Sequence, residues 1–271
     1  MLKRFLFVLF LSGVILQVNA QTYHAGISTN MGDMTFELYD DTPLHRDAFI
    51  ELARKGHFEN TLFYRVIENY IIQGGSKDSR NAPPGKFIGY GDPEKTVNDE
   101  IFDHHICKKG ALCAPRQPDE VNIFKQSDIS QFFVVQGTTF RPGQLDTMEL
   151  AVNRPIKKRI YRNIYTPDKK KRLKKLKKEE RWDEARELAS AIKDEIDVRY
   201  ELAEGKLIFT EAQREAYTTI GGAPQIENEY TVFGELISGM NVIDKIATLK
   251  TDENNRPYTD VIIHVTIKKV K

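Results

Sequence analysis

The stretch FYRVIENYIIQGG, residues 63–75, decides the fold of this chain. It contains two short apolar segments separated by Glu68 and Asn69, and it ends in two glycines. One arginine, Arg65, and one glutamine, Gln73, stand inside this otherwise strand-like sequence. Because a charge beside an apolar core destabilises a fold unless it is paired, we expect Arg65 either to meet an acidic partner or to be held ready for a ligand.

The sequence on either side of this stretch predicts a β-rich domain. Residues 23–41 alternate in the manner of a β-hairpin. Residues 41–58 predict a helix that Asp41 or Thr42 can cap, with Pro43 in its first turn and Gly56 at its end. Further strands are expected at 110–115, 130–137, 229–237 and 260–270, with a short helix at 238–247.

A polarised, helix-forming block interrupts the strands. Between residues 169 and 181 there are nine basic and two acidic residues, and between 182 and 204 three basic and eight acidic ones. We expect a solvated helix with one packed stripe, and its opposite charges would also allow it to fold back on itself or onto a partner. A break near Gly205 and a second short helix follow. The stripe at helical spacing is Trp182, Ala185, Leu188, Ala189, Ile192, Ile196 and Arg199.

The first twenty residues are typical of a secretory signal. Lys3 and Arg4 precede an apolar run from 5 to 16, and small residues place cleavage after Ala20. An uncleaved membrane anchor is disfavoured, because a bilayer span needs about 20 apolar residues. We therefore expect an exported protein, periplasmic or secreted. The 40 basic and 39 acidic residues give a net charge of +1, which predicts neither a nucleic-acid nor a membrane partner.

The two cysteines leave two alternatives open. Cys107 and Cys113 could pair across a turn in an oxidising compartment, or they could be plain core residues. The neighbouring His104 and His105 suggest a metal site, but their spacing matches no common zinc pattern. We therefore expect no metal.

Four segments together resemble the cyclophilin family of peptidyl-prolyl cis/trans isomerases. They are FYRVIENYIIQGG, GALCAPR, SQFFVVQG and NEYTVFGEL, in this order along the chain. The resemblance covers residues 23–137 and 221–271. It implies an eight-stranded antiparallel β-barrel closed by two helices, one after Pro43 and one around 242–247. The implied organisation is a signal peptide (1–20), a first barrel part (21–137), an α-helical insertion (138–220) and a second barrel part (221–271).

The resemblance also implies the site residues. The catalytic positions of the family fall on Arg65, Gln73 and Phe133. Gln225 stands where cyclosporin-sensitive members have tryptophan, so tight drug binding is not expected. Tyrosine replaces the family's usual phenylalanine at position 70 and its histidine at position 230. The implied substrate-binding residues are Tyr70, Ile71, Arg116, Gln131, Ile226 and Tyr230.

The chemistry of proline isomerisation fits these residue types. Rotation about an X-Pro bond breaks amide resonance against a barrier of roughly 18–20 kcal/mol. The twisted imide nitrogen regains a lone pair, so a donor aimed at it stabilises only the transition state. Arginine suits this task because it stays charged and its planar fork reaches two acceptors. No cofactor, metal or nucleophile is required.

The sequence therefore leaves two candidate functions. The first is an isomerase that acts on proline-containing, folding polypeptides after export. The second is a proline-binding chaperone or scaffold with little catalysis, in which the helical insertion holds clients or a partner protein. The set of Arg65, Gln73 and Phe133 favours the enzyme.

Overall fold

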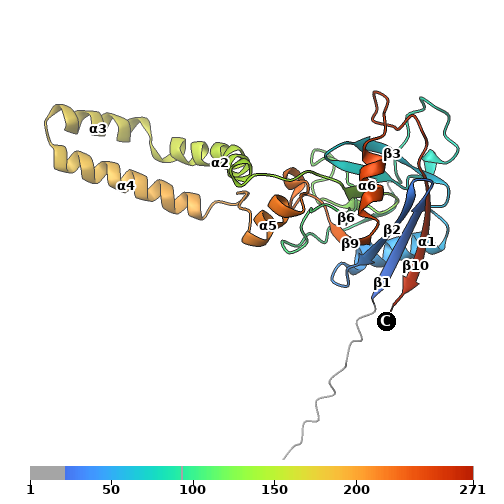
Figure 1. The fold of residues 1–271 in the computed structure, drawn as a ribbon. Helices are drawn as coiled ribbons and strands as arrows, with labels where there is room; N and C mark the ends of the chain where they lie inside the picture. Colours follow the sequence, from blue (N-terminus) through green and yellow to red (C-terminus); the bar gives the residue numbers. More distant parts are fainter. Residues whose placement is uncertain (1–21, 93, 271) are drawn as a thin grey trace, which may run out of the picture.

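The computed structural model describes residues 22–92 and 94–270, which form a β-barrel and a long helical arm (Figure 1). The predicted signal sequence over residues 1–20 lies outside them. No helix in the described ranges is long and apolar enough to span a bilayer.

Eight strands close the barrel in the order β1-β10-β3-β4-β8-β6-β9-β2, and every neighbouring pair is antiparallel. The predicted eight-stranded antiparallel barrel is therefore confirmed. Its strands are β1 (Tyr23–Thr29), β2 (Gly32–Leu38), β3 (Thr61–Ile67), β4 (Ile71–Gly74), β6 (Ala111–Cys113), β8 (Phe132–Val135), β9 (Val232–Ser238) and β10 (Ile262–Lys269).

Two helices cover the barrel, α1 (Pro43–Arg54) and α6 (Met240–Ala247). Thr42 precedes α1, but neither its hydroxyl nor Asp41 caps the helix as the sequence suggested. Instead the carboxylate of Glu100 accepts hydrogen bonds from the backbone N–H groups of Leu44 and His45, both at 3.0 Å. A carboxylate from a distant loop thus satisfies the free donors of the first turn.

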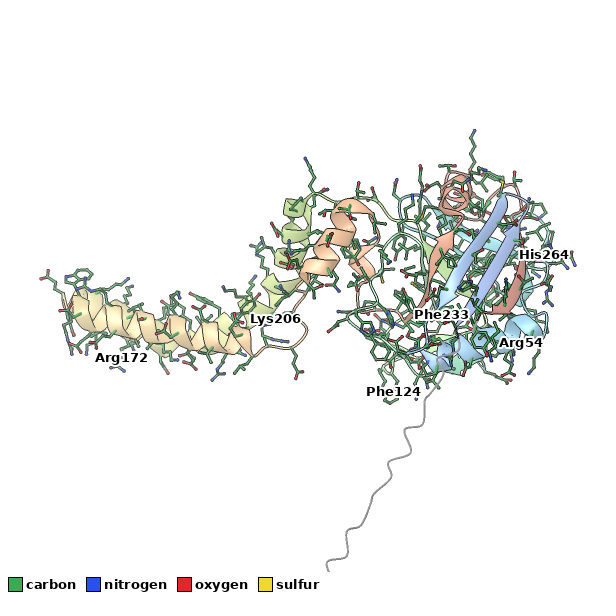
Figure 2. All side chains as sticks on the ribbon, turned by 60° about the horizontal axis from the view of Figure 1, so that its bottom comes forward. Arg54, Phe124, Arg172, Lys206, Phe233 and His264 are labelled. Carbon is green, nitrogen blue, oxygen red and sulfur yellow. The ribbon has the colours of Figure 1, made fainter. Side chains whose placement is uncertain are left out.

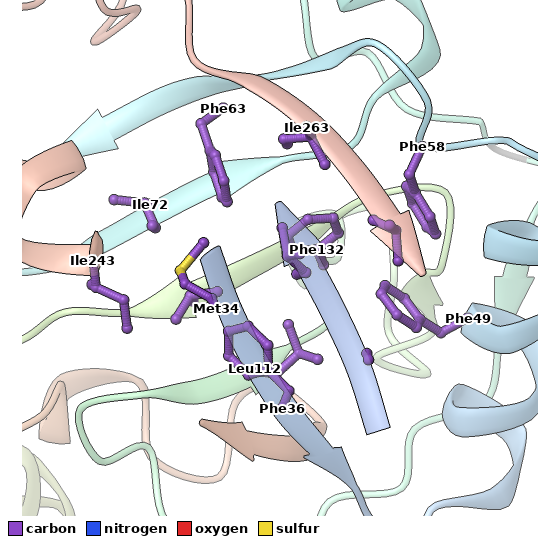
Figure 3. Close-up of a cluster of buried hydrophobic side chains, with 14 of the residues drawn as sticks. Met34, Phe36, Phe49, Phe58, Phe63, Ile72, Leu112, Phe132, Ile243 and Ile263 are labelled. Atoms are coloured by element: carbon purple, nitrogen blue, oxygen red, sulfur yellow. The ribbon is translucent and has the colours of Figure 1, made fainter. Parts of the chain in front are cut away.

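The barrel interior is packed with aromatic and aliphatic side chains (Figure 3). Phe132 meets Phe49, Phe58 and Phe63 edge to face at centroid distances of 5.8, 5.6 and 5.8 Å. Successive side chains of a strand point to opposite faces. Because Phe132 points into the barrel, its neighbour Phe133 belongs to a separate apolar cluster on the outer face.

The arm is built from four helices, α2 (Pro142–Ile164), α3 (Pro167–Lys178), α4 (Trp182–Glu201) and α5 (Glu211–Thr219). The polarised block folds back on itself, because Glu180 adopts a φ of 58° and turns the chain between α3 and α4. Lys169 and Glu195 then form an ion pair at 2.8 Å. Figure 2 shows Arg172 near the far end of the arm and Lys206 closer to the barrel.

The packed stripe of α4 is narrower than the sequence predicted. Ile192 and Ile196 pack with Ile164 of α2, and Ala185 is also buried. Trp182, expected in this stripe, is 54% exposed because it is the first residue of α4, and Arg199 faces solvent with Glu195.

A short neck joins arm and barrel. Thr138 and Gly222 exchange two backbone hydrogen bonds, of 3.1 and 2.9 Å, where the chain leaves and re-enters the barrel. Gly222 has no room for a side chain, because a Cβ there would lie 2.4 Å from the carbonyl oxygen of Cys107. The remaining elements are the two-stranded sheet of β5 (Thr96–Val97) and β7 (Ser127–Asp128) and the 3₁₀ turns η1 (Lys77–Ser79) and η2 (Pro224–Ile226).

Candidate active site

A lateral row of residues crosses five strands of the barrel wall. Strand pairing places Arg65 of β3 opposite Gln73 of β4, and Gln73 opposite Phe133 of β8. The row continues from Phe133 to Cys113 of β6 and then to Val232 of β9. Residues that are far apart in the sequence therefore meet on one face because the antiparallel register aligns them.

An apolar floor lies beside Arg65 on this face. Phe133, Ile71 and Ile226 are buried, and Tyr70 and Tyr230 pack against them. The ring of Tyr230 meets that of Phe133 edge to face at 5.3 Å and 87°. The structure thus brings these five sequence-predicted residues into one apolar cluster.

Arg65 is half-buried, and its guanidinium is held by a neutral partner. Its Nη1 donates to Oε1 of Gln73 at 3.1 Å. Arg65 forms no ion pair within the described part of the chain. Of the two expectations for this residue, the acidic partner is therefore not found. The positive charge stays available to an acceptor that arrives from outside.

Gln73 is in turn held by a chain of hydrogen bonds that reaches into the protein. Its Nε2 donates to the hydroxyl oxygen of Tyr64 at 2.7 Å, and the Tyr64 hydroxyl donates to Oε1 of Gln131. The Nε2 of Gln131 donates to Oδ2 of Asp128 at 2.8 Å. Each donor meets one acceptor, so the chain sets the orientation of both amides and presents Oε1 of Gln73 to Arg65.

Sequence reasoning missed Tyr64 and Asp128. Simple alternation would send Tyr64 to the barrel core, because its neighbour Arg65 faces outward. An irregularity in the β3–β4 pairing between Phe63 and Arg65 turns Tyr64 instead into a small outer cluster with Leu62 and Ile88. Burial raises the pKa of Tyr64, so its hydroxyl keeps the proton that it donates to Gln131.

The last predicted residue, Arg116, lies at the edge of the floor and is fully paired. Its Nε and Nη2 donate to the backbone and carboxylate of Glu229, at 2.7 and 2.6 Å, and Nη1 donates to Asp119. The guanidinium carbon lies 5.4 Å from the ring centre of Tyr230. Arg116 therefore fixes the segment that carries Tyr230. Its charge, unlike that of Arg65, is already compensated.

A family model matches almost all of the described chain. The model of the family described as "Cyclophilin type peptidyl-prolyl cis-trans isomerase/CLD" matches residues 24–152 and 153–267. This chain belongs to the cyclophilin-type peptidyl-prolyl cis-trans isomerases. The resemblance inferred from the four sequence segments is thereby confirmed, and with it the enzyme class.

Relatives from bacteria match nearly the whole cyclophilin. A Staphylococcus saprophyticus protein, named provisionally as a peptidyl-prolyl cis-trans isomerase, is 25% identical over 249 residues, or 91% of this chain and 92% of the relative. A Streptococcus pyogenes protein, named provisionally as a bifunctional phosphatase/peptidyl-prolyl cis-trans isomerase, is 28% identical over 244 residues, or 88% of this chain and 37% of the relative.

Solved structures agree at the level of the fold. The crystal structure of a Cryptosporidium parvum cyclophilin type isomerase in the presence of the dipeptide Ala-Pro covers 90% of this chain and 98% of its own, with a TM-score of 0.50 and 19% identity. A second crystal structure of the same protein gives a TM-score of 0.51, also at 19% identity.

Two further features adjoin the floor of this cyclophilin. Cys107 and Cys113 are free, buried thiols within its apolar cluster. A cavity of about 530 Å³ opens between the root of the arm and the residues on either side of Ile226. Gln225, at the position of the family's tryptophan, lines this cavity together with Met148 and Val152 of α2.

Proposed function

We propose that this cyclophilin accelerates X-Pro rotation by donation from Arg65 to the twisted imide nitrogen, while Phe133, Ile71 and Ile226 hold the proline ring. The observation that carries the proposal is the hydrogen bond between Arg65 and Gln73 beside the apolar floor, with no carboxylate among residues 22–92 and 94–270 paired to the guanidinium. A rigid neutral partner keeps the donor in place without neutralising it. The increase in rate therefore comes from electrostatic preorganisation, because the fixed donor stabilises the charge that develops in the transition state.

The test is prolyl isomerisation of a short X-Pro peptide, measured by NMR exchange, for the wild type and Arg65→Ala. Loss of one preorganised donor is expected to lower kcat/KM about 10²–10³-fold. Arg65→Lys keeps the charge without the planar fork, so it is expected to recover only part of the loss. Arg54→Ala, an exposed arginine at the end of α1, is the matched control. Full activity of Arg65→Ala would refute the role of Arg65.

We also propose that the substrates are folding polypeptides outside the cytoplasm. This rests on residues 1–20, whose basic, apolar and small-residue order is that of a secretory signal. Expression in a bacterial host with an intact export pathway is expected to give a protein whose N-terminus is Gln21. An N-terminus that still carries the apolar run would contradict export by this route.

A second candidate function, client holding by the insertion, is favoured by the surface of the arm. Leu150, Leu202 and Ile208 are 70%, 78% and 64% exposed. The cavity between α2 and the Gln225 segment lies at the root of the arm. In this proposal the arm binds apolar segments of an unfolded chain and raises the local concentration of its prolines near Arg65.

A further inference from the structure

The loop before β6 meets the segment before α1 in a cluster that the isomerase chemistry does not use. His104 and His105 both direct Nε2 at the carboxylate of Asp41, each at 2.8 Å from one of its oxygens. One ligand atom from each of the three residues lies within 4.8 Å of the others. Two imidazoles and one carboxylate thus converge on one point of the surface.

Stacking holds both imidazole rings in this orientation. The ring of His105 lies on Tyr39 at 4.1 Å with an interplanar angle of 10°, and its side chain is only 10% exposed. The ring of His104 lies on Phe102 at 5.5 Å and 19°. Tyr39 itself packs on the apolar cluster of Phe133. Much of the ordering of the imidazoles is therefore present before any ligand binds.

The donor set selects the kind of ligand. Imidazole nitrogens suit Zn²⁺, Cu²⁺ and Ni²⁺, whereas Mg²⁺ and Ca²⁺ prefer oxygen alone. With bonds of about 2.0–2.1 Å to nitrogen and oxygen, neighbouring ligand atoms of a tetrahedral zinc ion lie about 3.3 Å apart. The three ligand atoms lie within 4.8 Å of one another, so each separation needs to change by at most about 1.5 Å. The exposed side chains of Asp41 and His104 allow this small movement.

We propose that Asp41, His104 and His105 bind a divalent transition-metal ion, with zinc as the reference ion and water completing its coordination. The ion links the segment before α1 to the loop before β6. It lies outside the Arg65 row and takes no part in the isomerisation. The sequence prediction of no metal rested on the spacing of histidines and cysteines. It could not include Asp41, which is 63 residues from His104.

The test is a calorimetric titration of the tag-free, chelator-treated protein with Zn²⁺, together with thermal unfolding with and without the ion. One ion per chain and a higher melting temperature with Zn²⁺ are expected, because the ion binds only the folded arrangement. Asp41→Asn, His104→Ala and His105→Ala are each expected to weaken binding at least tenfold and to remove the thermal shift.

The matched control is His264→Ala, which removes an exposed histidine paired with a single carboxylate, Glu59, at 2.8 Å. It is expected to bind Zn²⁺ like the wild type. Isomerase activity without metal reports that each variant is folded, since none of these residues belongs to the Arg65 site. Absence of saturable one-to-one binding, binding unchanged in any of the three variants, or equal loss in His264→Ala would overturn the proposal.

Discussion

The orientation of Arg65 depends on a hydroxyl group that does not touch it. Gln73 can present Oε1 to Arg65 only while its Nε2 is occupied, and Nε2 is occupied by the oxygen of Tyr64. The same hydroxyl donates to Gln131, which is anchored on Asp128. Without this chain, rotation of the Gln73 amide would turn an NH₂ group toward the guanidinium, and the two donors would repel each other.

Removal of the Tyr64 hydroxyl is therefore expected to affect turnover more than binding. We predict that Tyr64→Phe lowers kcat about tenfold, the equivalent of one hydrogen bond of about 1.4 kcal/mol, with KM nearly unchanged. NMR exchange on an X-Pro peptide over a range of concentrations separates the two constants. Tyr258→Phe, at a 74% exposed tyrosine, is the control. A raised KM with normal kcat would assign Tyr64 to the substrate floor instead.

Part of the candidate site could be predicted from the sequence, because it follows from local strand pairing and from alternation. Arg65 and Gln73 lie on strands that a short turn joins, so their alignment follows from local pairing. Phe133 follows from alternation, because Phe132 fills the core. Tyr64 and Asp128 could not be found in this way. Their contacts depend on an irregularity in β3 and on a loop that packs across it, and neither has a periodic signature.

At the scale of elements, α5 is fastened to the segment after η2 by one buried acid. Tyr217 and Gln213 of α5 donate to the carboxylate of Glu227, as does the backbone N–H of Cys107. Burial raises the pKa of Glu227 to about 7, and the two N–H donors offset this only in part. The unfolded chain has the ordinary value of 4.5, so between pH 4.5 and 7 the folded state binds more protons.

Stability is therefore expected to fall as pH rises through this window, by up to about 3 kcal/mol from this group. We predict that Glu227→Gln flattens this part of the pH profile, because the amide carries no proton to lose. Urea unfolding at several pH values between 4.5 and 8 measures the difference. Glu215→Gln, on the exposed face of α5, should retain the wild-type slope. Parallel profiles for wild type and Glu227→Gln would contradict the raised pKa.

The neck gives a second prediction at this scale. A Cβ on Gly222 would meet the Cys107 oxygen at 2.4 Å and the Tyr217 ring at 2.8 Å, so the backbones must separate. We predict that Gly222→Ala destabilises the protein by about 1–3 kcal/mol. Gly143→Ala, in the first turn of α2 with open space around it, should be neutral or slightly stabilising. Thermal unfolding of both variants and the wild type measures the effect. Equal melting temperatures for Gly222→Ala and the wild type would contradict this prediction.

The elements differ in how far the sequence determines them. Strong patterns predicted α1, α6 and the short helix α5, whose Thr210 and Gln213 form a capping box. The helix α2 lies within the predicted α-helical insertion but was not predicted as a separate helix, because Pro155 lies within it and no strong apolar period marks its course. The sequence left it open that the polarised block folds back on itself, but the position of the turn between α3 and α4 was not predicted, since Glu180 is a non-glycine residue at a positive φ.

At the scale of the whole molecule, we expect the barrel to carry the isomerase activity and the arm to bind unfolded chains. We predict that deletion of residues 140–218 leaves peptide isomerisation within a few-fold of the wild type but reduces the ability to delay aggregation of an unfolded protein. The physical reason is that Arg65 and its chain of hydrogen bonds lie in the barrel, whereas the exposed apolar side chains lie on the arm. Parallel peptide and aggregation assays compare the two. Unchanged client binding and turnover would refute the role of the arm.

A milder variant tests the same role in case the deletion prevents folding. Replacement of Leu150, Leu202 and Ile208 by serine removes exposed apolar surface and leaves the packed residues Ile164, Ile192 and Ile196 intact. It is expected to reproduce the loss of aggregation suppression with full peptide turnover.

The neck also bears on the order in which the protein folds. Strands β8 and β9 take their places on either side of β6 only after the chain between them has doubled back, and a disordered segment of 83 residues, from 138 to 220, would make that step slow. The helices of the arm pair through contacts within the insertion itself. Once they are paired, Thr138 and Gly222 are already neighbours. An effective loop roughly eightfold shorter lowers the entropy cost of closure by about 2 kcal/mol. We therefore expect the helices of the arm to form before the barrel closes, so that β9 and β10, the last strands to be translated, pair with strands that are already held close to them.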